Sequence, residues 1–373
     1  MIKEVLSLTS PNVVPTKHWH LLDDGRVQCD ICPRACRLKE GQRGLCFVRA
    51  NVENQVALVS YGRSSGFAID PIEKKPLNHF YPGSSVLSFG TAGCNSACKF
   101  CQNWDISKSR EMDKLMSQAS PERIAQEAKK SGCKSVAFTY NDPVVFHEYA
   151  IDTAIACKEI GLQSVAVTAG YVCEAPRAEF YQYMDAVNVD LKAFTEEFYW
   201  KLTGTHLQSV LDTLEYLANE TSVWLEITTL LIPDRNDGEK EIHELAEWVA
   251  NHVGLYVPLH FSAFHPDYKM MDVPHTPVET LRRARRIALS HGLKYVYTGN
   301  VHDEEGDTTF CHQCHEPLII RDWYQLKYYG LEKSVDKSVD NTVGICGNCG
   351  ASCAGRYDVK PGHWGAKREQ LFF

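Results

Sequence analysis

The stretch that decides the fold runs from Ser85 to Cys101 and reads SVLSFGTAGCNSACKFC. Its first part, Ser85 to Phe89, is a short apolar run that predicts a β-strand. Directly after this strand the chain places Cys94, Cys98 and Cys101 in a C-x3-C-x2-C pattern. A strand that ends in a loop of closely set cysteines indicates a metal site at the carboxyl end of that strand.

Strand and helix patterns alternate on the C-terminal side of this stretch. Ser120 is a predicted N-cap with Pro121 at the first helical position, and Gly132 is a predicted stop. Further strand patterns lie at residues 135–139, 164–168, 186–191, 223–231, 257–263 and 294–298. This alternation predicts a parallel sheet built from βαβ units, either doubly wound or closed towards a barrel. In both architectures the chemistry lies at the C-terminal ends of the strands.

Composition narrows the class of protein. The chain has 373 residues, of which 44% are hydrophobic and 23% are charged, with a net charge of −8. This is a globular composition, and its acidity argues against a large nucleic-acid-binding surface. The N-terminus lacks the pattern of a signal peptide, and no stretch approaches 18 apolar residues, so we expect a cytoplasmic chain without a membrane partner. In that compartment clustered cysteines are metal ligands more often than disulfides.

The 15 cysteines fall into three groups, with few left over. Two groups flank the predicted α/β core and carry four regularly spaced cysteines each. We therefore expect three parts: a cysteine-rich N-terminal extension over residues 1–80, a core over 81–300, and a zinc-ribbon-like module over 301–373. A short tandem at residues 333–340 within the last part is predicted to be a polar loop.

The C-terminal group consists of two C-x2-C pairs, Cys311 with Cys314 and Cys346 with Cys349. Four thiolates in this arrangement predict a tetrahedral metal, normally structural zinc, although a rubredoxin-like iron accepts the same ligands. The N-terminal group is formed by Cys29, Cys32, Cys36 and Cys46. Zinc and an iron–sulfur cluster are both open there, and at this point we favour zinc.

The central triad allows a sharper interpretation. Three thiolates this close can each take one iron of a cubane cluster, whereas zinc would require a distant fourth ligand. The run from Gly93 to Trp104, with Phe100 before the third cysteine, resembles the signature of the radical S-adenosylmethionine (SAM) superfamily. Together with residues 70–77, DPIEKKPL, it resembles the pyruvate formate-lyase activating enzyme family and, within it, the radical enzyme of the AmmeMemoRadiSam system.

The resemblance implies an oxidoreductase with a partial (β/α)6 barrel. In such enzymes a [4Fe-4S] cluster, here on Cys94, Cys98 and Cys101, reductively cleaves SAM to a 5′-deoxyadenosyl radical that abstracts hydrogen from a substrate. An external electron donor of the flavodoxin or ferredoxin type is implied. The substrate is either a glycine of a partner enzyme, as in the activases, or another protein or small molecule. The competing class is a non-enzymatic iron–sulfur or zinc protein that carries electrons or binds RNA.

The resemblance also implies residues that contact the cofactor. At the family's amino-group-binding motif this chain has Tyr140-Asn141-Asp142, without the glycines common in that motif. In the activases an aspartate before the matching Thr168 helps to hold a monovalent cation, and here that position is Val167. The full set of predicted cofactor contacts is Phe100, Gln102, Asn103, Tyr140, Asn141, Asp142, Thr168, Asp190, Lys192, Glu226 and His265.

Overall fold

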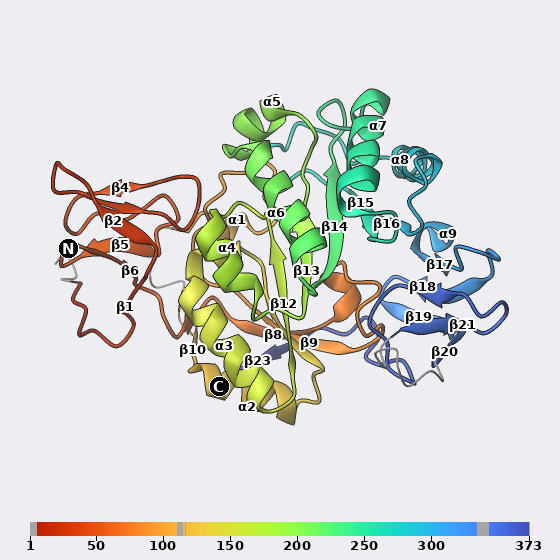
Figure 1. Cartoon of the computed structure of the whole chain (residues 1–373), viewed down its shortest axis with the longest axis horizontal. Coiled ribbons are helices and arrows are strands. Elements are labelled where there is room, and N and C mark those ends of the chain that lie inside the picture. The colour runs from red at the N-terminus through yellow and green to blue at the C-terminus, as the bar shows by residue number, and fades with distance from the viewer. Residues whose placement is uncertain (1–5, 110–114, 116, 334–342, 373) are drawn as a thin grey trace.

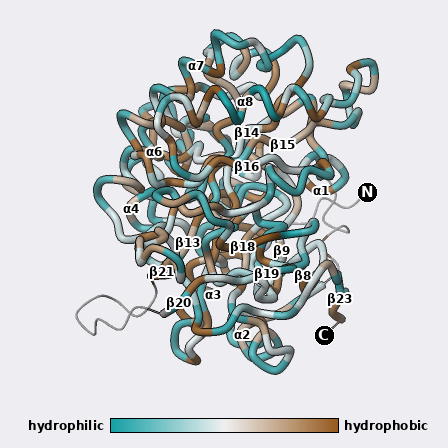
Figure 2. Tube along the Cα trace, turned by 90° about the vertical axis from the view of Figure 1, so that its right-hand side faces the viewer, coloured by the Kyte–Doolittle hydropathy of each residue, from teal (hydrophilic) through white to brown (hydrophobic). Residues whose placement is uncertain are grey.

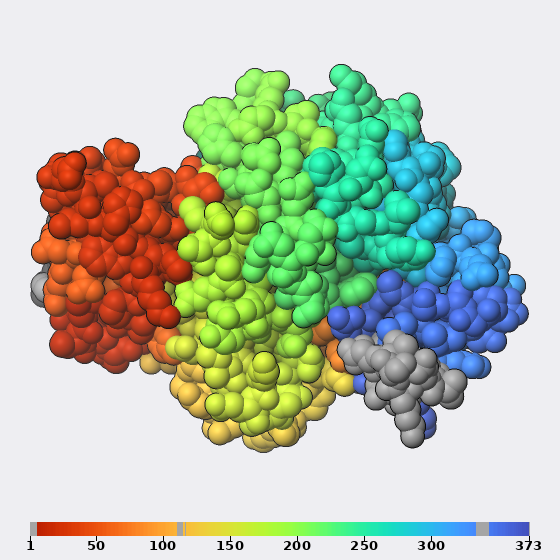
Figure 3. All heavy atoms as spheres, in the orientation of Figure 1, coloured from red at the N-terminus to blue at the C-terminus, as the bar shows by residue number. Residues whose placement is uncertain are grey.

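The computed structural model describes residues 6–109, 115, 117–333 and 343–372. The chain forms three regions in sequence order (Figure 1). A small N-terminal lobe stands at one end of the molecule, an α/β region occupies the middle, and the C-terminal segment packs at the other end (Figure 3). The tandem at residues 333–340 lies outside the described residues apart from its first position.

A largely parallel sheet forms the middle region. Its parallel strands are β9 (Ser85–Phe89), β11 (Ser135–Phe138), β12 (Gln163–Thr168), β13 (Ala186–Asp190), β14 (Trp224–Leu231), β15 (Leu259–Ala263) and β16 (Val296–Gly299). They are hydrogen-bonded to one another in this sequence order, and most of their residues are buried. The predicted parallel α/β architecture is therefore confirmed, and each parallel strand falls on a predicted strand pattern.

Two antiparallel strands extend one edge of this sheet. They are β8 (Phe67–Pro71), which pairs with β9, and β23 (Glu369–Leu371), which pairs with β8. Within the described residues the sheet thus has nine strands and is open, with β16 and β23 at its edges. The predicted core of residues 81–300 leaves out two strands of the central sheet. β8 comes from the predicted N-terminal extension, and β23 comes from the predicted C-terminal module.

Amphipathic helices connect the parallel strands and cover the sheet. The helices of the α/β region are α1 (Trp104–Ser107), α2 (Pro121–Lys130), α3 (His147–Glu159), α4 (Glu174–Tyr181), α5 (Glu196–Phe198), α6 (Leu207–Glu220), α7 (Glu239–Trp248), α8 (Val278–Ser290) and α9 (Glu304–Asp307), with shorter or wider turns at η1 (Ile72–Lys74), η3 (Pro143–Phe146), η4 (Tyr199–Thr203) and η5 (Val249–Val253). Ser120 caps α2 as predicted, since its hydroxyl accepts a hydrogen bond from the Arg123 N–H. Hydrophilic and hydrophobic segments alternate along the outer helices in Figure 2, as amphipathic helices require. None of the helices in the described ranges combines the length and apolarity that a membrane crossing needs.

The two flanking regions consist of short antiparallel strands. In the N-terminal lobe these are β1 (Val14–Pro15), β2 (Trp19–Leu21), β3 (Val27–Cys29), β4 (Arg37–Leu38), β5 (Arg49–Val52) and β6 (Gln55–Leu58), while β7 (Arg63–Ser64) pairs with β10 (Ser117–Gln118). The C-terminal module contains β17 (Thr309–Phe310), β18 (Pro317–Asp322), β19 (Gln325–Tyr329), β20 (Leu331–Lys333), β21 (Gly344–Cys346) and β22 (Ser352–Cys353).

A buried arginine joins each flanking region to the middle. Arg49 of β5 is 2% exposed and donates to both carboxylate oxygens of Glu148 at the start of α3, at 3.1 and 2.7 Å. Arg321 of β18 is fully buried and donates to the backbone carbonyls of Asn78 and Asp307, at 2.8 and 3.0 Å. These cations can be buried because most of their N–H groups donate hydrogen bonds to partners.

Candidate active site

A cavity of about 380 Å³ opens at the carboxyl ends of the parallel strands. This is the edge where a parallel sheet places its ligand site. Most of the predicted site residues share it. Those that line the cavity are Cys94, Cys98, Phe100, Cys101, Gln102, Asn103, Tyr140, Asn141, Asp142, Thr168, Asp190 and Lys192. Val167, which stands at the position of the activase cation ligand, lines it as well.

The loop that carries the three cysteines is fixed by Asn141. The Asn141 side-chain amide donates to the Gly93 carbonyl at 2.7 Å, and its oxygen accepts from the Thr91 N–H at 3.0 Å. Gly93 has a φ of +78°, and a Cβ at Gly90 would lie 2.3 Å from the Thr139 carbonyl oxygen. The positive φ of Gly93 and the close approach of the Thr139 carbonyl to Gly90 therefore require glycine at both positions.

Cationic side chains surround the thiols of the triad. Burial raises the pKa of Cys98, and the charges of Lys192 and Lys108 oppose that effect. The Lys108 ammonium also donates to the Ser96 carbonyl at 2.8 Å, which holds it beside the loop. The Cys101 sulfur lies 3.0 Å from the Ser107 hydroxyl oxygen. Positive charge and a hydroxyl donor next to these sulfurs suit thiolates that bind a metal.

Asp142 links two neighbouring strand ends beneath the cavity. Its carboxylate accepts from the Thr168 hydroxyl at 3.1 Å and from the Ala169 N–H at 3.0 Å, and it also caps η3 through the Val144 N–H. Burial raises the pKa of Asp142 to about 6, although these donors act in the opposite direction. The carboxylate thus shapes the cavity wall through backbone and side-chain donors of the chain itself.

Lys192 and Asp190 form a pair at the end of β13. The Lys192 ammonium donates to an Asp190 carboxylate oxygen at 2.8 Å, and the Lys192 N–H donates to the Tyr199 hydroxyl at 3.0 Å. Burial alone would lower the pKa of Lys192, but Asp190 and the sulfur of Cys98 outweigh it and hold the pKa above its usual value. A cation therefore faces the cavity next to the triad.

Lysines from the segment after β8 also reach the cavity. Lys74 and Lys75 line it and donate to the two carboxylate oxygens of Asp70, at 3.0 and 2.8 Å. The Tyr140 hydroxyl donates to the same carboxylate at 3.1 Å. The sequence of this segment supported the family resemblance, but the segment was not predicted to lie in the site. Further lining residues that were not predicted are Ser262, Asn300 and Tyr324.

The structure places two predicted cofactor contacts elsewhere. Glu226 is fully buried near the start of β14 and accepts hydrogen bonds from the backbone of Asn78 and His79, from Trp224, and from His260. His265 follows β15 without lining the cavity, and its ring approaches the adjacent Pro266 carbonyl at 3.4 Å. Neither residue lines the cavity, because Glu226 lies farther down its strand and His265 follows the end of its own, and the cofactor contact of each stays a prediction.

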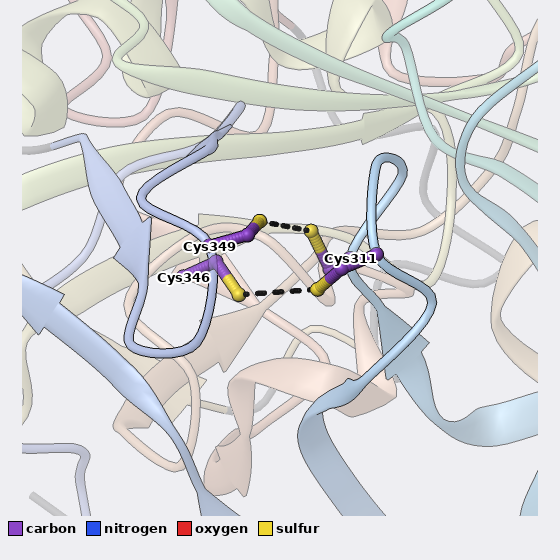
Figure 4. A group of neighbouring side chains, drawn as sticks. Cys311, Cys346 and Cys349 are labelled. Carbon is purple, nitrogen blue, oxygen red and sulfur yellow. Dashed lines mark hydrogen bonds between the residues drawn. The ribbon is translucent and has the colours of Figure 1, made fainter.

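The C-terminal cysteines form a compact group. The ligand atoms of Cys311, Cys314, Cys346 and Cys349 all lie within 4.8 Å of one another. The two closest pairs, Cys311 with Cys349 and Cys314 with Cys346, have sulfur–sulfur distances of 3.6 and 3.7 Å (Figure 4). Tetrahedral zinc with Zn–S bonds of about 2.3 Å places its sulfurs about 3.8 Å apart. This group is thus consistent with a mononuclear metal.

A third group of metal-ligand type was not predicted. His18, His147 and Glu179 have ligand atoms within 4.8 Å of one another. Glu179 already accepts from His18 at 2.5 Å and from Lys17 at 3.0 Å, and His147 contacts the Pro176 carbonyl at 3.2 Å. These hydrogen bonds explain why the three residues lie together: they join the N-terminal lobe to helices α3 and α4.

Comparison with known proteins gives the family. The sequence profile of the Radical SAM superfamily matches residues 89–249. The uncharacterized protein MJ0808 of Methanocaldococcus jannaschii is 42% identical over 314 residues, which cover 84% of this chain and 93% of that protein. The pyruvate formate-lyase 1-activating enzyme of Escherichia coli K12 is 25% identical over 58% of this chain and 93% of its own length. A solved domain of a pyruvate-formate lyase-activating enzyme from Bacteroides vulgatus is 19% identical, covers 44% of this chain and 99% of its own, and has a TM-score of 0.40. The chain therefore belongs to the radical SAM superfamily and is related to the pyruvate formate-lyase activating enzymes.

Proposed function

We propose that this chain reductively cleaves SAM at a [4Fe-4S] cluster held by Cys94, Cys98 and Cys101. The observation that supports this most strongly is that all three cysteines line one cavity together with the Asp190–Lys192 pair. Three thiolates ligate three irons of a cubane and leave the fourth for SAM. When bound, the cluster supplies the electron that converts SAM into methionine and the 5′-deoxyadenosyl radical, which abstracts hydrogen from the substrate.

The residues around the cavity have positioning roles in this proposal. Lys192, oriented by Asp190, presents a cation to the carboxylate of SAM. Asn141 holds the triad loop through the Thr91 and Gly93 backbone, and Asp142 fixes the neighbouring strand ends. Phe100 packs against Phe198 with ring centroids 5.7 Å apart, which keeps the loop between the second and third cysteines against the core. In this account the parallel strands include those of the family's partial (β/α)6 barrel.

The C-terminal cysteines have a separate, structural role in the proposal. Their compact spacing suits one zinc ion bound by all four thiolates, with no position left for a substrate. The module they close contributes Tyr324 to the cavity wall. Zinc would therefore stabilise a segment that helps to enclose the active site.

Activation of a glycyl-radical enzyme is one form that the reaction could take, because the chain is related to E. coli pyruvate formate-lyase 1-activating enzyme. That match uses 93% of the E. coli enzyme but only 58% of this chain. The cysteine-rich ends give this chain more than the activase requires. We therefore propose a distinct substrate, as the resemblance to the AmmeMemoRadiSam enzyme suggests, and a flavodoxin or ferredoxin as the electron donor.

The direct test is formation of 5′-deoxyadenosine by the full chain, purified without oxygen, reduced with dithionite and supplied with SAM. We expect the product from the wild type and from Cys133→Ala, which removes a buried cysteine outside the cavity. We expect at least a hundredfold less from Cys98→Ala, and a raised KM for SAM with Lys192→Met. Absence of the product from the wild type, or undiminished product from Cys98→Ala, would refute the proposal. A non-enzymatic electron carrier predicts the first of these outcomes.

A further inference from the structure

The four N-terminal cysteines surround one cavity between the N-terminal lobe and the α/β region. Cys29, Cys32, Cys36 and Cys46 all line it. The lobe adds Ile31 and Leu38 to the wall, and the α/β region adds Asn95, Val144 and Val145. The cysteines thus converge on a buried space that the core of the molecule helps to close.

Their spacing does not suit a single ion. Four thiolates on one zinc lie about 3.8 Å apart, and the C-terminal group has this spacing, with sulfur–sulfur distances of 3.6 and 3.7 Å. Among the described residues, which include all four N-terminal cysteines, no three of these four sulfurs lie within 4.8 Å of one another.

The catalytic triad gives a second reference for the spacing of cysteine sulfurs within the same chain. Its sulfurs, too, form no group within 4.8 Å among the described residues, although all three face one cavity. Thiolates on a cubane lie farther apart than thiolates on one ion, because each binds a different iron. In the spacing of its sulfurs, the N-terminal group therefore resembles the triad and differs from the C-terminal group.

Two arginines line the same space. Arg49 and Arg34 both line the cavity, and Arg49 is 2% exposed. The Arg49 Nε–H is buried without a hydrogen-bond partner in the described part of the chain. A buried donor without a partner is costly. The sulfides and thiolates of an iron–sulfur cluster are acceptors that such donors can meet.

We propose that Cys29, Cys32, Cys36 and Cys46 hold a second [4Fe-4S] cluster, with one thiolate on each iron. This reverses the preference for zinc that the sequence alone suggested. Because four thiolates leave no iron open, such a cluster transfers electrons and does not bind SAM. The site goes beyond the proposed function, and its metal content can be tested without reference to SAM cleavage.

The position of the site places the second cluster directly behind the triad. A Cβ at Gly93 would lie 1.8 Å from the Cys46 carbonyl oxygen, so the backbones of the two cysteine loops touch. Arg34 Nε also donates to the Asn95 carbonyl at 3.0 Å, one residue after Cys94. Electrons that reach the N-terminal cluster would therefore be one backbone contact away from the catalytic loop.

The test uses the full chain with Cys94→Ala, Cys98→Ala and Cys101→Ala, purified without oxygen. This variant should still contain about four irons and four sulfides per chain, and should give a paramagnetic signal on reduction that SAM does not alter. Adding Cys29→Ala and Cys46→Ala should remove both the iron and the signal. Adding Cys133→Ala instead should leave them unchanged, and circular dichroism should match across the set.

Metal analysis of the triple variant alone can overturn the proposal. A triple variant that contains no sulfide and about two zincs per chain would show that the N-terminal cysteines bind zinc. Iron and sulfide that persist after Cys29→Ala and Cys46→Ala would show that another site holds them. Because the triple variant retains all four N-terminal cysteines, this result does not depend on whether the fivefold variant folds.

Discussion

The two ends of the chain both bring four cysteines together, and both are attached to the middle region by a buried arginine. At the C-terminus the sulfurs lie 3.6 and 3.7 Å apart in their closest pairs, and Cys349 is exposed. At the N-terminus the four cysteines are spread around a cavity, with two arginines in its wall. Equal ligand sets thus have different geometries, and we infer that the sulfur spacing, not the ligand count, decides which metal each end holds.

The largest effect should come from the compact C-terminal site. Cys346→Ala should reduce zinc from about one per chain to near zero, because a three-thiolate site in a small module loses most of its affinity. The C-terminal strands should then lose protection in hydrogen exchange, while the iron content stays the same. If zinc is retained and the strands stay protected, the zinc assignment is wrong.

The buried arginines should differ in what their loss costs. Arg49→Met leaves the Glu148 carboxylate without its partner and should lower the free energy of unfolding by about 3–5 kcal/mol. Arg321→Met leaves no carboxylate without a partner, only two backbone carbonyls and the Thr309 hydroxyl without this donor, and should cost about 1–3 kcal/mol. Urea denaturation of the anaerobic proteins measures both values.

A double variant separates the ion pair from simple packing at the N-terminal attachment. Arg49→Met with Glu148→Leu should recover most of the stability lost in Arg49→Met, because replacing a whole buried pair with apolar groups is often neutral. Equal losses in the single and double variants would contradict the idea that the unpaired Glu148 carboxylate is what destabilises the protein.

Two buried carboxylates, Glu148 and Glu73, should respond to pH with opposite signs. Burial raises the pKa of Glu148, but Arg49 outweighs it and lowers the pKa from its usual 4.5 to about 2. The stability that Glu148 contributes is thus complete above pH 4.5 and is lost as the pH falls through about 2. Burial raises the pKa of Glu73, whose carboxylate accepts from the Gly83 N–H, to about 7. Its contribution is complete below pH 4.5 and is lost as the pH rises through about 7.

Glu73→Gln and Glu148→Gln form a matched pair for this comparison. Between pH 5.5 and 8, Glu73→Gln should show a smaller fall in stability with rising pH than the wild type. Glu148→Gln should lower stability by a constant amount over the same range. Urea unfolding at several pH values measures both effects, and identical slopes in Glu73→Gln and the wild type would remove the role given to Glu73.

The sequence was sufficient for the features that depend on local spacing. Apolar runs separated by helical patterns placed the parallel strands, and Asp190 and Lys192, two residues apart, were both expected in the cofactor site. Glu226 shows what such reasoning leaves open further down a strand. Thr228 lines the cavity, but Glu226, on the same face, lies two residues or about 7 Å closer to the start of β14. There its partners are Asn78 and His79, which no local pattern relates to β14.

Contacts between distant parts of the chain could not be predicted. Lys75 and Tyr324 meet at one cavity although about 250 residues separate them. The pairing of β23 with β8 depends on how the C-terminal segment returns across the molecule. The spread of the N-terminal sulfurs likewise depends on Asn95 and Val144, which close the cavity from the α/β region. Spacing along the chain identified the ligands, while the tertiary packing set the distances between them.

The measurement that tests the account most directly is the iron, sulfide and zinc content of the wild-type chain, purified without oxygen. Two four-iron clusters and one zinc site predict about eight irons, eight sulfides and one zinc per chain. About four irons, four sulfides and two zincs would contradict the distinction drawn between the two ends, and a chain without sulfide would contradict the catalytic cluster as well.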